Sequence, residues 1–240
     1  TGVNQIGIKA VGAGYFTTTD FNEENIEVYW SSRTAVAVAT SSSTQAYGVF
    51  NIQVQVTGKL NITGIPDANG NLPKIIGGGS NRLFKVESGG ELVVRSLNLT
   101  GGRVSETSCI SPYSDCGGGA VHVSGGMFNT TNSVFFSNRA YYGGALLGTN
   151  DGNVVVINST LAYNVAVENG GAVHIRLRSG SISPKFIECG FVNNQVQTKN
   201  DGEWTNAFGG AVSITPGHDG FNGDPLNESA VIFDRCYFNG

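Results

Sequence analysis

Basic side chains gather at one place in this chain, the segment GGAVHIRLR. His174, Arg176 and Arg178 alternate along it, and alternate residues of an extended strand share one face. A lyase that removes a proton from a sugar needs a basic group of this kind together with acidic Ca²⁺ ligands. No acidic cluster is predicted beside the three residues. We therefore interpret them as a solvated face and not as a catalytic base.

Carboxylates that could work as an acid and base pair are also missing from the sequence pattern. Glycoside hydrolysis needs two such groups flanking one bond, and the chain contains no Asp-Asp pair. The segment Gly217-His218-Asp219-Gly220 is the nearest approach to a catalytic histidine motif. It is typical of a Gly-rich turn, so we expect no catalytic residue and no enzyme activity.

Metal ligands are similarly sparse. Asp67, Asn69 and Asn71 have the oxygen ligands of a calcium loop but lack the downstream Glu of an EF-hand, and we interpret them as a turn. His122 and His174 are predicted to lie on one outward column two coils apart. That separation is about 10 Å, too long for one metal ion. The expectation is no metal and no cofactor.

Composition excludes some partners. The formal net charge is −4, whereas nucleic acids and anionic membranes require a basic surface. No apolar run approaches the roughly 20 residues that cross a bilayer, so no membrane insertion by this segment is expected. N-x-S/T sequons, which mark N-glycosylation in a secretory pathway, occur at Asn61, Asn98, Asn129, Asn158 and Asn227.

The elements that position these residues are predicted by a repeat. GGA blocks begin at Gly118, Gly143, Gly170 and Gly209, at intervals of 25, 27 and 39 residues. Each is followed by a second motif, [SC]-x-[FL]-x-x-N, whose fourth copy is cut short at Gly240. Intervals of 20 to 50 residues are typical of solenoids, and alternation in GGAVHV and GGAVHI predicts short strands. We expect an all-β, right-handed parallel β-helix with about 25 residues per coil.

The repeated residues have structural tasks in such a fold. A Gly pair permits a tight corner or a close backbone approach, and stacked Asn amides can bond backbone groups of neighbouring coils. The expected structural residues are Gly118, Gly119, Gly143, Gly144, Gly170, Gly171, Gly209, Gly210, Asn138, Asn164 and Asn194. Phe135, Leu161, Phe191 and Phe238 are predicted to stack in the core.

The four cysteines fall into two pairs. Cys109 and Cys116 lie in one loop, where a local disulfide fits an oxidising compartment. Cys189 and Cys236 occupy the same repeat position, held by Ser133 and Ser159 in earlier copies. Stacking in adjacent coils is compatible with a disulfide and equally with two buried thiols.

The paired motif resembles the repeat of chlamydial polymorphic outer-membrane proteins, and similar repeats occur in large surface proteins of algae and protists. The resemblance covers roughly residues 118–240 and implies a β-helix that acts in adhesion. Leu161 in place of Phe and the truncated fourth copy depart from the pattern.

These observations predict an organisation and a role. Residues 1–50 are expected to form a strand-rich cap or the first coils, and residues 51–240 a β-helix that continues beyond Gly240. The predicted function is that of an extracellular or cell-surface glycoprotein, structural or adhesive, whose partners are further copies, other surface proteins or glycans. The alternative is a carbohydrate-active enzyme, either a polysaccharide lyase or a glycosidase, or a carbohydrate-binding module.

Overall fold

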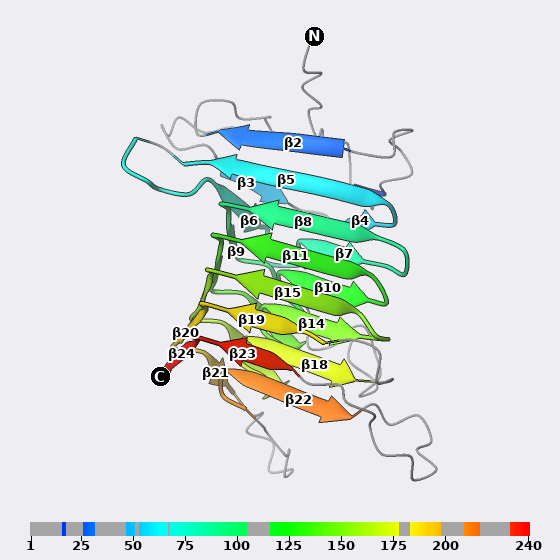
Figure 1. Ribbon diagram of the computed structural model, residues 1–240, viewed down its shortest axis with the longest axis vertical. Coiled ribbons are helices and arrows are strands. Elements are labelled where there is room, and N and C mark those ends of the chain that lie inside the picture. Colours follow the sequence, from blue (N-terminus) through cyan, green and yellow to red (C-terminus); the bar gives the residue numbers. More distant parts are fainter. Residues whose placement is uncertain are drawn as a thin grey trace.

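The computed structural model describes residues 16–17, 26–31, 47–50, 53–66, 68–104, 116–177, 183–197, 209–216 and 231–240. Throughout this part of the chain the regular structure is β-strand, without a helix. All strand pairings in it are parallel. Figure 1 shows the strands stacked one below another along the long axis of the molecule. The predicted all-β, parallel and stacked architecture is confirmed.

Three sheets run the length of the stack and a fourth is shorter. Sheet A contains β1 (Phe16–Thr17), β4 (Val54–Val56), β7 (Phe84–Val86), β10 (Val121–Ser124), β14 (Leu146–Thr149), β18 (Val173–Leu177) and β22 (Val212–Pro216). Sheet B contains β2 (Ile26–Ser31), β5 (Lys59–Ile65), β8 (Glu91–Arg95), β11 (Met127–Thr131), β15 (Asn153–Ile157), β19 (Lys185–Ile187) and β23 (Ile232–Asp234).

Sheet C contains β3 (Tyr47–Phe50), β6 (Lys74–Gly77), β9 (Asn98–Thr100), β12 (Val134–Phe136), β16 (Thr160–Ala162), β20 (Gly190–Val192) and β24 (Tyr237–Asn239). Sheet D contains β13 (Arg139–Tyr142), β17 (Val165–Asn169) and β21 (Gln195–Val196). The chain visits sheets A, B and C in turn, and we call each such succession a unit. Strands β1 to β3, from the predicted cap region, extend the same three sheets.

The GGA blocks form the corner that leads into sheet A. Their first glycines have positive φ, for example 54° at Gly143 and 64° at Gly170, a conformation that costs glycine little. Their second glycines lie against the next unit, because a Cβ on Gly144 would contact the backbone oxygen of Gly171. The blocks therefore place successive units as close together as parallel strands require.

The core lies between the sheets and is built from aligned columns. In sheet C, Leu99, Phe135, Leu161, Phe191 and Phe238 follow one another in register, which confirms the predicted stack. The rings of Phe191 and Phe238 lie 4.7 Å apart and 6° from parallel. Leu99, Phe135, Leu161 and Phe191 are buried, and each contributes on the order of 2 kcal/mol. Phe238 continues the stack but is 55% exposed.

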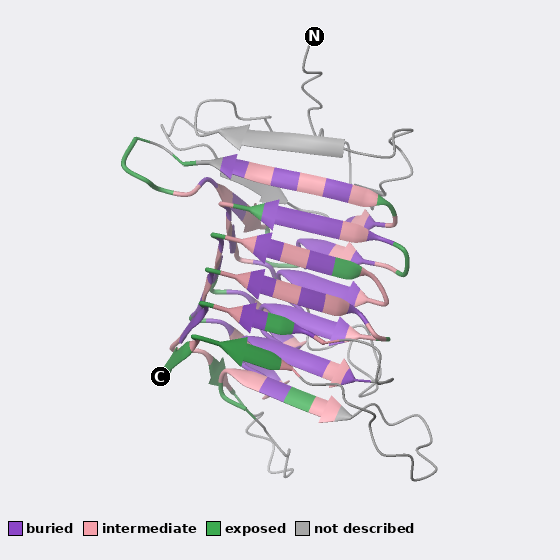
Figure 2. Cartoon of the chain, in the orientation of Figure 1, coloured by how far each residue is buried: buried purple, intermediate pink, exposed green. Residues whose placement is uncertain are grey.

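Burial alternates along β5, β11 and β15 of sheet B, as Figure 2 shows for β5 by its purple and pink bands. In β11, Phe128 and Thr130 are buried, while Met127 is exposed and Asn129 partly exposed. Period-two alternation leaves one face of the sheet in the core and the other toward solvent. The outer face of sheet B is therefore where polar side chains of successive units are brought together.

Candidate functional site

A groove crosses the outer face of sheet B. Its volume is about 450 Å³, within the range of roughly 300–1,000 Å³ found for small-molecule sites. Strands β5, β8, β11 and β15 supply the side chains that line it: Lys59, Asn61, Glu91, Val93, Arg95, Asn129, Thr130, Thr131, Val155 and Ile157. No residue of the lining was predicted as part of a ligand site, although Asn61 and Asn129 were predicted as sequons.

Strand register explains how these residues meet. Lys59 of β5 is aligned with Glu91 of β8, and their side chains form an ion pair at 3.2 Å. Asn61, Val93, Asn129 and Val155 form one row across the four strands. Residues far apart in sequence thus form one surface because each takes the same outward position in its own unit.

Charge in the groove is mainly positive. The Lys59–Glu91 pair is about one-third exposed, so solvent screening leaves it worth less than about 1 kcal/mol. Arg95, at the far end of β8, is exposed and forms no ion pair within the described residues. Its guanidinium group is available to a ligand and can bind a carboxylate through two hydrogen bonds.

The asparagine column of the repeat lies at the turn after sheet C. Asn138 and Asn164 are 1% and 0% exposed. Their side chains bond the main chain of neighbouring units, with the Asn164 Nδ2 donating to the Phe135 carbonyl at 3.0 Å. Asn194 continues the column and donates from Nδ2 to the Leu161 carbonyl at 2.8 Å. These residues have a structural role.

A second polar column runs through the turn between sheets B and C. Ser159 Oγ donates to the carbonyl of Ile157 at 2.7 Å and accepts from the Ser133 amide at 3.0 Å. Cys189 takes the same position in the next unit, and its sulfur lies 3.3 Å from the carbonyl oxygen of Ile187. The thiol therefore replaces a serine hydroxyl in a continuous hydrogen-bonded column.

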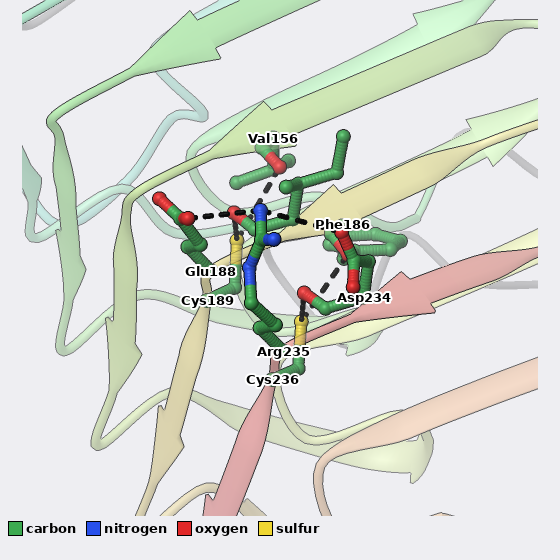
Figure 3. A network of polar contacts seen from close by, with 8 residues as sticks. Val156, Phe186, Glu188, Cys189, Asp234, Arg235 and Cys236 are labelled. Atoms are coloured by element: carbon green, nitrogen blue, oxygen red, sulfur yellow. Dashed lines mark hydrogen bonds and ion pairs between the residues drawn. The ribbon is translucent and has the colours of Figure 1, made fainter.

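Cys236 follows Cys189 in this column, 3.4 Å from the Asp234 carbonyl oxygen. Figure 3 shows the two sulfur atoms at successive levels, beside the 2.9 Å ion pair between Arg235 and Glu188. Both cysteines are free thiols, so the structure contains the thiol arrangement and not the alternative disulfide. Burial, opposed by a hydrogen bond from Ser159 and reinforced by Cys236, raises the pKa of Cys189 to about 11.

The histidine column lies on the outer face of sheet A, aligned as His122, Leu147, His174 and Ser213. The solvated face predicted there differs from the structure, because His122 is 5% and His174 1% exposed. The Tyr142 ring stacks on His174 at 5.5 Å. Arg176 covers the same region, since its guanidinium lies 4.6 Å from the Tyr142 ring centre.

Electrostatics in this cluster keep the histidine neutral. Burial and the Arg176 charge lower the pKa of His174 to about 3. Burial and the neighbouring Glu168 raise the pKa of Tyr142 well above its usual value, and its hydroxyl lies 3.3 Å from a Glu168 carboxylate oxygen. A buried neutral imidazole is well placed for packing and is closed to a substrate from solvent.

The sequons lie in different environments. Asn61 and Asn129 line the groove, Asn98 lies partly exposed on β9, and Asn158 is exposed in a turn. Asn227, Cys109, Arg178, Asp67 and the segment from Gly217 to Gly220 lie outside the described residues. Cys116 is buried, and its pairing with Cys109 stays a prediction.

Two common features are absent from the described ranges. They contain no group of three or more His, Cys, Asp or Glu side chains placed to hold a metal ion. Nor do they include a helix with the length and apolar character needed to cross a membrane. Comparisons of the chain with protein-family models, curated proteins and solved structures give no match.

Proposed function

We propose that this chain is a right-handed parallel β-helix with about 25 residues per coil, belonging to an extracellular or cell-surface glycoprotein. Its role is structural or adhesive, with a rigid rod that carries binding surfaces and glycans. One observation carries the proposal. Parallel sheets A, B and C continue in register from unit to unit around a shared core.

Stiffness follows from the ways in which neighbouring units are joined. Main-chain hydrogen bonds link them in three sheets, and the asparagine column adds buried side-chain bonds at a fourth place. Each unit contacts its neighbours above and below, so local deformation is opposed along the whole stack. A stiff element of this kind suits a protein that must hold a surface at a distance.

Self-association is part of the proposal. Strands at the edge of a sheet can accept further strands, and we propose that copies of the protein associate in this way. The glycans are proposed at the sequons, with exposed Asn158 as the most accessible of those described, and a disulfide between Cys109 and Cys116.

Electron microscopy of the protein isolated from its source tests this function. Filaments with a regular subunit repeat, or straight rods on the cell surface, are expected. Flexible or globular particles would contradict the rod, and single short rods at high concentration would contradict self-association. Mass spectrometry of the same sample identifies occupied sequons and paired cysteines.

A carbohydrate-binding function is the second candidate, and the groove on sheet B favours it. Glu91 is the single carboxylate residue of the described lining, and it is paired with Lys59. Catalysis by two carboxylates is therefore less well supported than binding. Incubation with a panel of polyuronates and neutral glycans separates the two, because an enzyme releases shorter products and a binding module does not.

A further inference from the structure

We infer that the groove on the outer face of sheet B binds an acidic saccharide, a chain of sugars carrying carboxylate or sulfate groups. The inference rests on the proposed adhesive function and names its ligand class. It draws on three features of the groove: a row of amides and aliphatic side chains, unbalanced positive charge, and a floor of fully paired strands.

The row across the groove matches the mixed surface of a sugar chain. Asn61 and Asn129 lie two strands apart, about 10 Å, with Val93 between them and Val155 beyond. Each amide both donates and accepts hydrogen bonds, as sugar hydroxyls do. Val155, which is partly exposed, offers apolar contact to the C–H face of a sugar ring, whereas Val93 is 6% exposed and forms the floor between the two amides.

Positive charge selects an acidic ligand. Lys59 and Arg95 line the groove with a single carboxylate, Glu91, and exposed Lys185 follows Val155 farther along the same row. This local excess of cations belongs to a chain whose formal net charge is −4. Attraction of an acidic chain to the groove is therefore electrostatic and is weakened by salt.

Other ligand classes fit less well. Nucleic-acid bases stack on aromatic rings, and the described lining has none. A peptide that adds to a sheet needs a free edge, whereas β8 and β11 are paired on both sides. A divalent cation prefers several carboxylates, and Glu91 alone is present, already bound to Lys59.

The inference has a consequence for two sequons. An N-glycan on Asn61 or Asn129 would remove the side-chain amide from ligand contact and fill the groove. Binding-competent protein is therefore expected to carry unmodified side chains at both positions, with Asn158 left as an exposed glycosylation site. Substituting Asn129→Gln removes the sequon and keeps an amide in the row.

Titration calorimetry with tetragalacturonate tests the inference, using the full chain produced without glycosylation and a neutral galactose tetramer as the comparison ligand. Arg95→Gln is expected to weaken tetragalacturonate binding about tenfold, the effect of losing a charge-assisted hydrogen bond. Arg103→Gln is the matched control, because Arg103 is exposed, carries the same charge and lies outside the groove. It should bind like the unaltered chain.

Several results would overturn the inference: no binding of tetragalacturonate, equal binding of the neutral tetramer, or equal losses in the Arg95 and Arg103 variants. Glycans found on both Asn61 and Asn129 in protein from its source would do so as well. The proposed rod is judged separately by microscopy of the same preparations. Rods that do not bind the saccharide would reject the proposed ligand and support the proposed rod. Globular particles that bind the saccharide would reject the rod and support the ligand.

Discussion

The Nδ2 group of Asn138 donates a hydrogen bond to the Oδ1 of Asn164, 3.1 Å away in the next unit. Asn164 repeats the contact with Asn194 at 3.0 Å. The same Asn164 Oδ1 also accepts from the Asn138 main-chain amide at 3.0 Å. Asn138 and Asn164 thus each bond both the main chain and the next amide, and removal of Asn164 leaves hydrogen-bond partners without a bond on both sides.

Asn164→Ala is expected to lower the free energy of unfolding by about 2–3 kcal/mol, because it strips hydrogen-bond partners from buried groups. Urea unfolding followed by circular dichroism measures the loss. Asn129→Ala is the matched control, since Asn129 lies partly exposed on the outer face of β11. Equal effects of the two substitutions would contradict a structural role for the column.

Comparison of Gly170→Ala with Gly79→Ala separates the effect of close packing from that of backbone strain. Gly170 has φ 64°, and a Cβ there would contact the Val173 carbonyl oxygen. Gly79 has φ 78° with nothing within 4 Å of its Cβ position. Gly79→Ala should cost about 1 kcal/mol from the left-handed conformation alone. Gly170→Ala should lower the stability by well over that amount, as measured by thermal unfolding. Similar losses of stability in the two variants would contradict the close packing at the corner.

Serine is expected to replace cysteine in the polar column with little loss, because Ser159 already performs the same task one unit earlier. Cys189→Ser should therefore unfold at nearly the same urea concentration as the unaltered chain. Cys189→Val removes the donor while keeping an apolar side chain. It should unfold at a lower urea concentration than Cys189→Ser. If Cys189→Val were the more stable of the two variants, the hydrogen-bonded column would be contradicted.

Alkaline pH should weaken the folded state through Cys189. Its folded pKa is about 11, against an ordinary 9.0, so the unfolded chain loses the thiol proton first. The stability contributed by the neutral thiol is complete below pH 9 and is lost as pH rises through 11. Unfolding of Cys189→Ser across this range should show a smaller decline, and an unchanged decline would contradict the assignment.

Low pH should weaken the folded state through His174. Its folded pKa is about 3, against an ordinary 6.5, so the unfolded chain takes up a proton first. The contribution is present above pH 6.5 and is lost as pH falls toward 3. His174→Phe keeps an aromatic ring beside Tyr142 and cannot titrate. It should lose less stability between these pH values, as measured by urea midpoints, and a parallel loss would contradict the burial of His174.

Local motifs were enough to predict the sheets and their stacking. Glycine pairs and Asn residues have few uses at fixed spacing in strands, and the Phe135–Leu161 alignment follows directly from the repeat. Burial of His174 was not predictable in the same way, because Tyr142 reaches it from sheet D, a sheet between the two motifs that the repeat pattern does not mark.

The groove shows a second limit of sequence reasoning. Asn61 and Arg95 belong to the earlier units, where no GGA block marks the register. Their outward positions are ordinary for strand residues, and they meet only once β5 and β8 are aligned. A one-residue change in the register of either strand would have turned its side chain toward the core and away from the other.

The parallel register of the stack has a mechanical consequence. The hydrogen bonds of sheets A, B and C all point along the axis in which the units follow one another. A pulling force along that axis loads all the hydrogen bonds between two neighbouring units together. The bonds between the next two units stay intact until the first set breaks. Stretching would therefore extend the protein in small, regular steps, one unit at a time, and a tether of this kind would dissipate a sudden load without losing the whole fold.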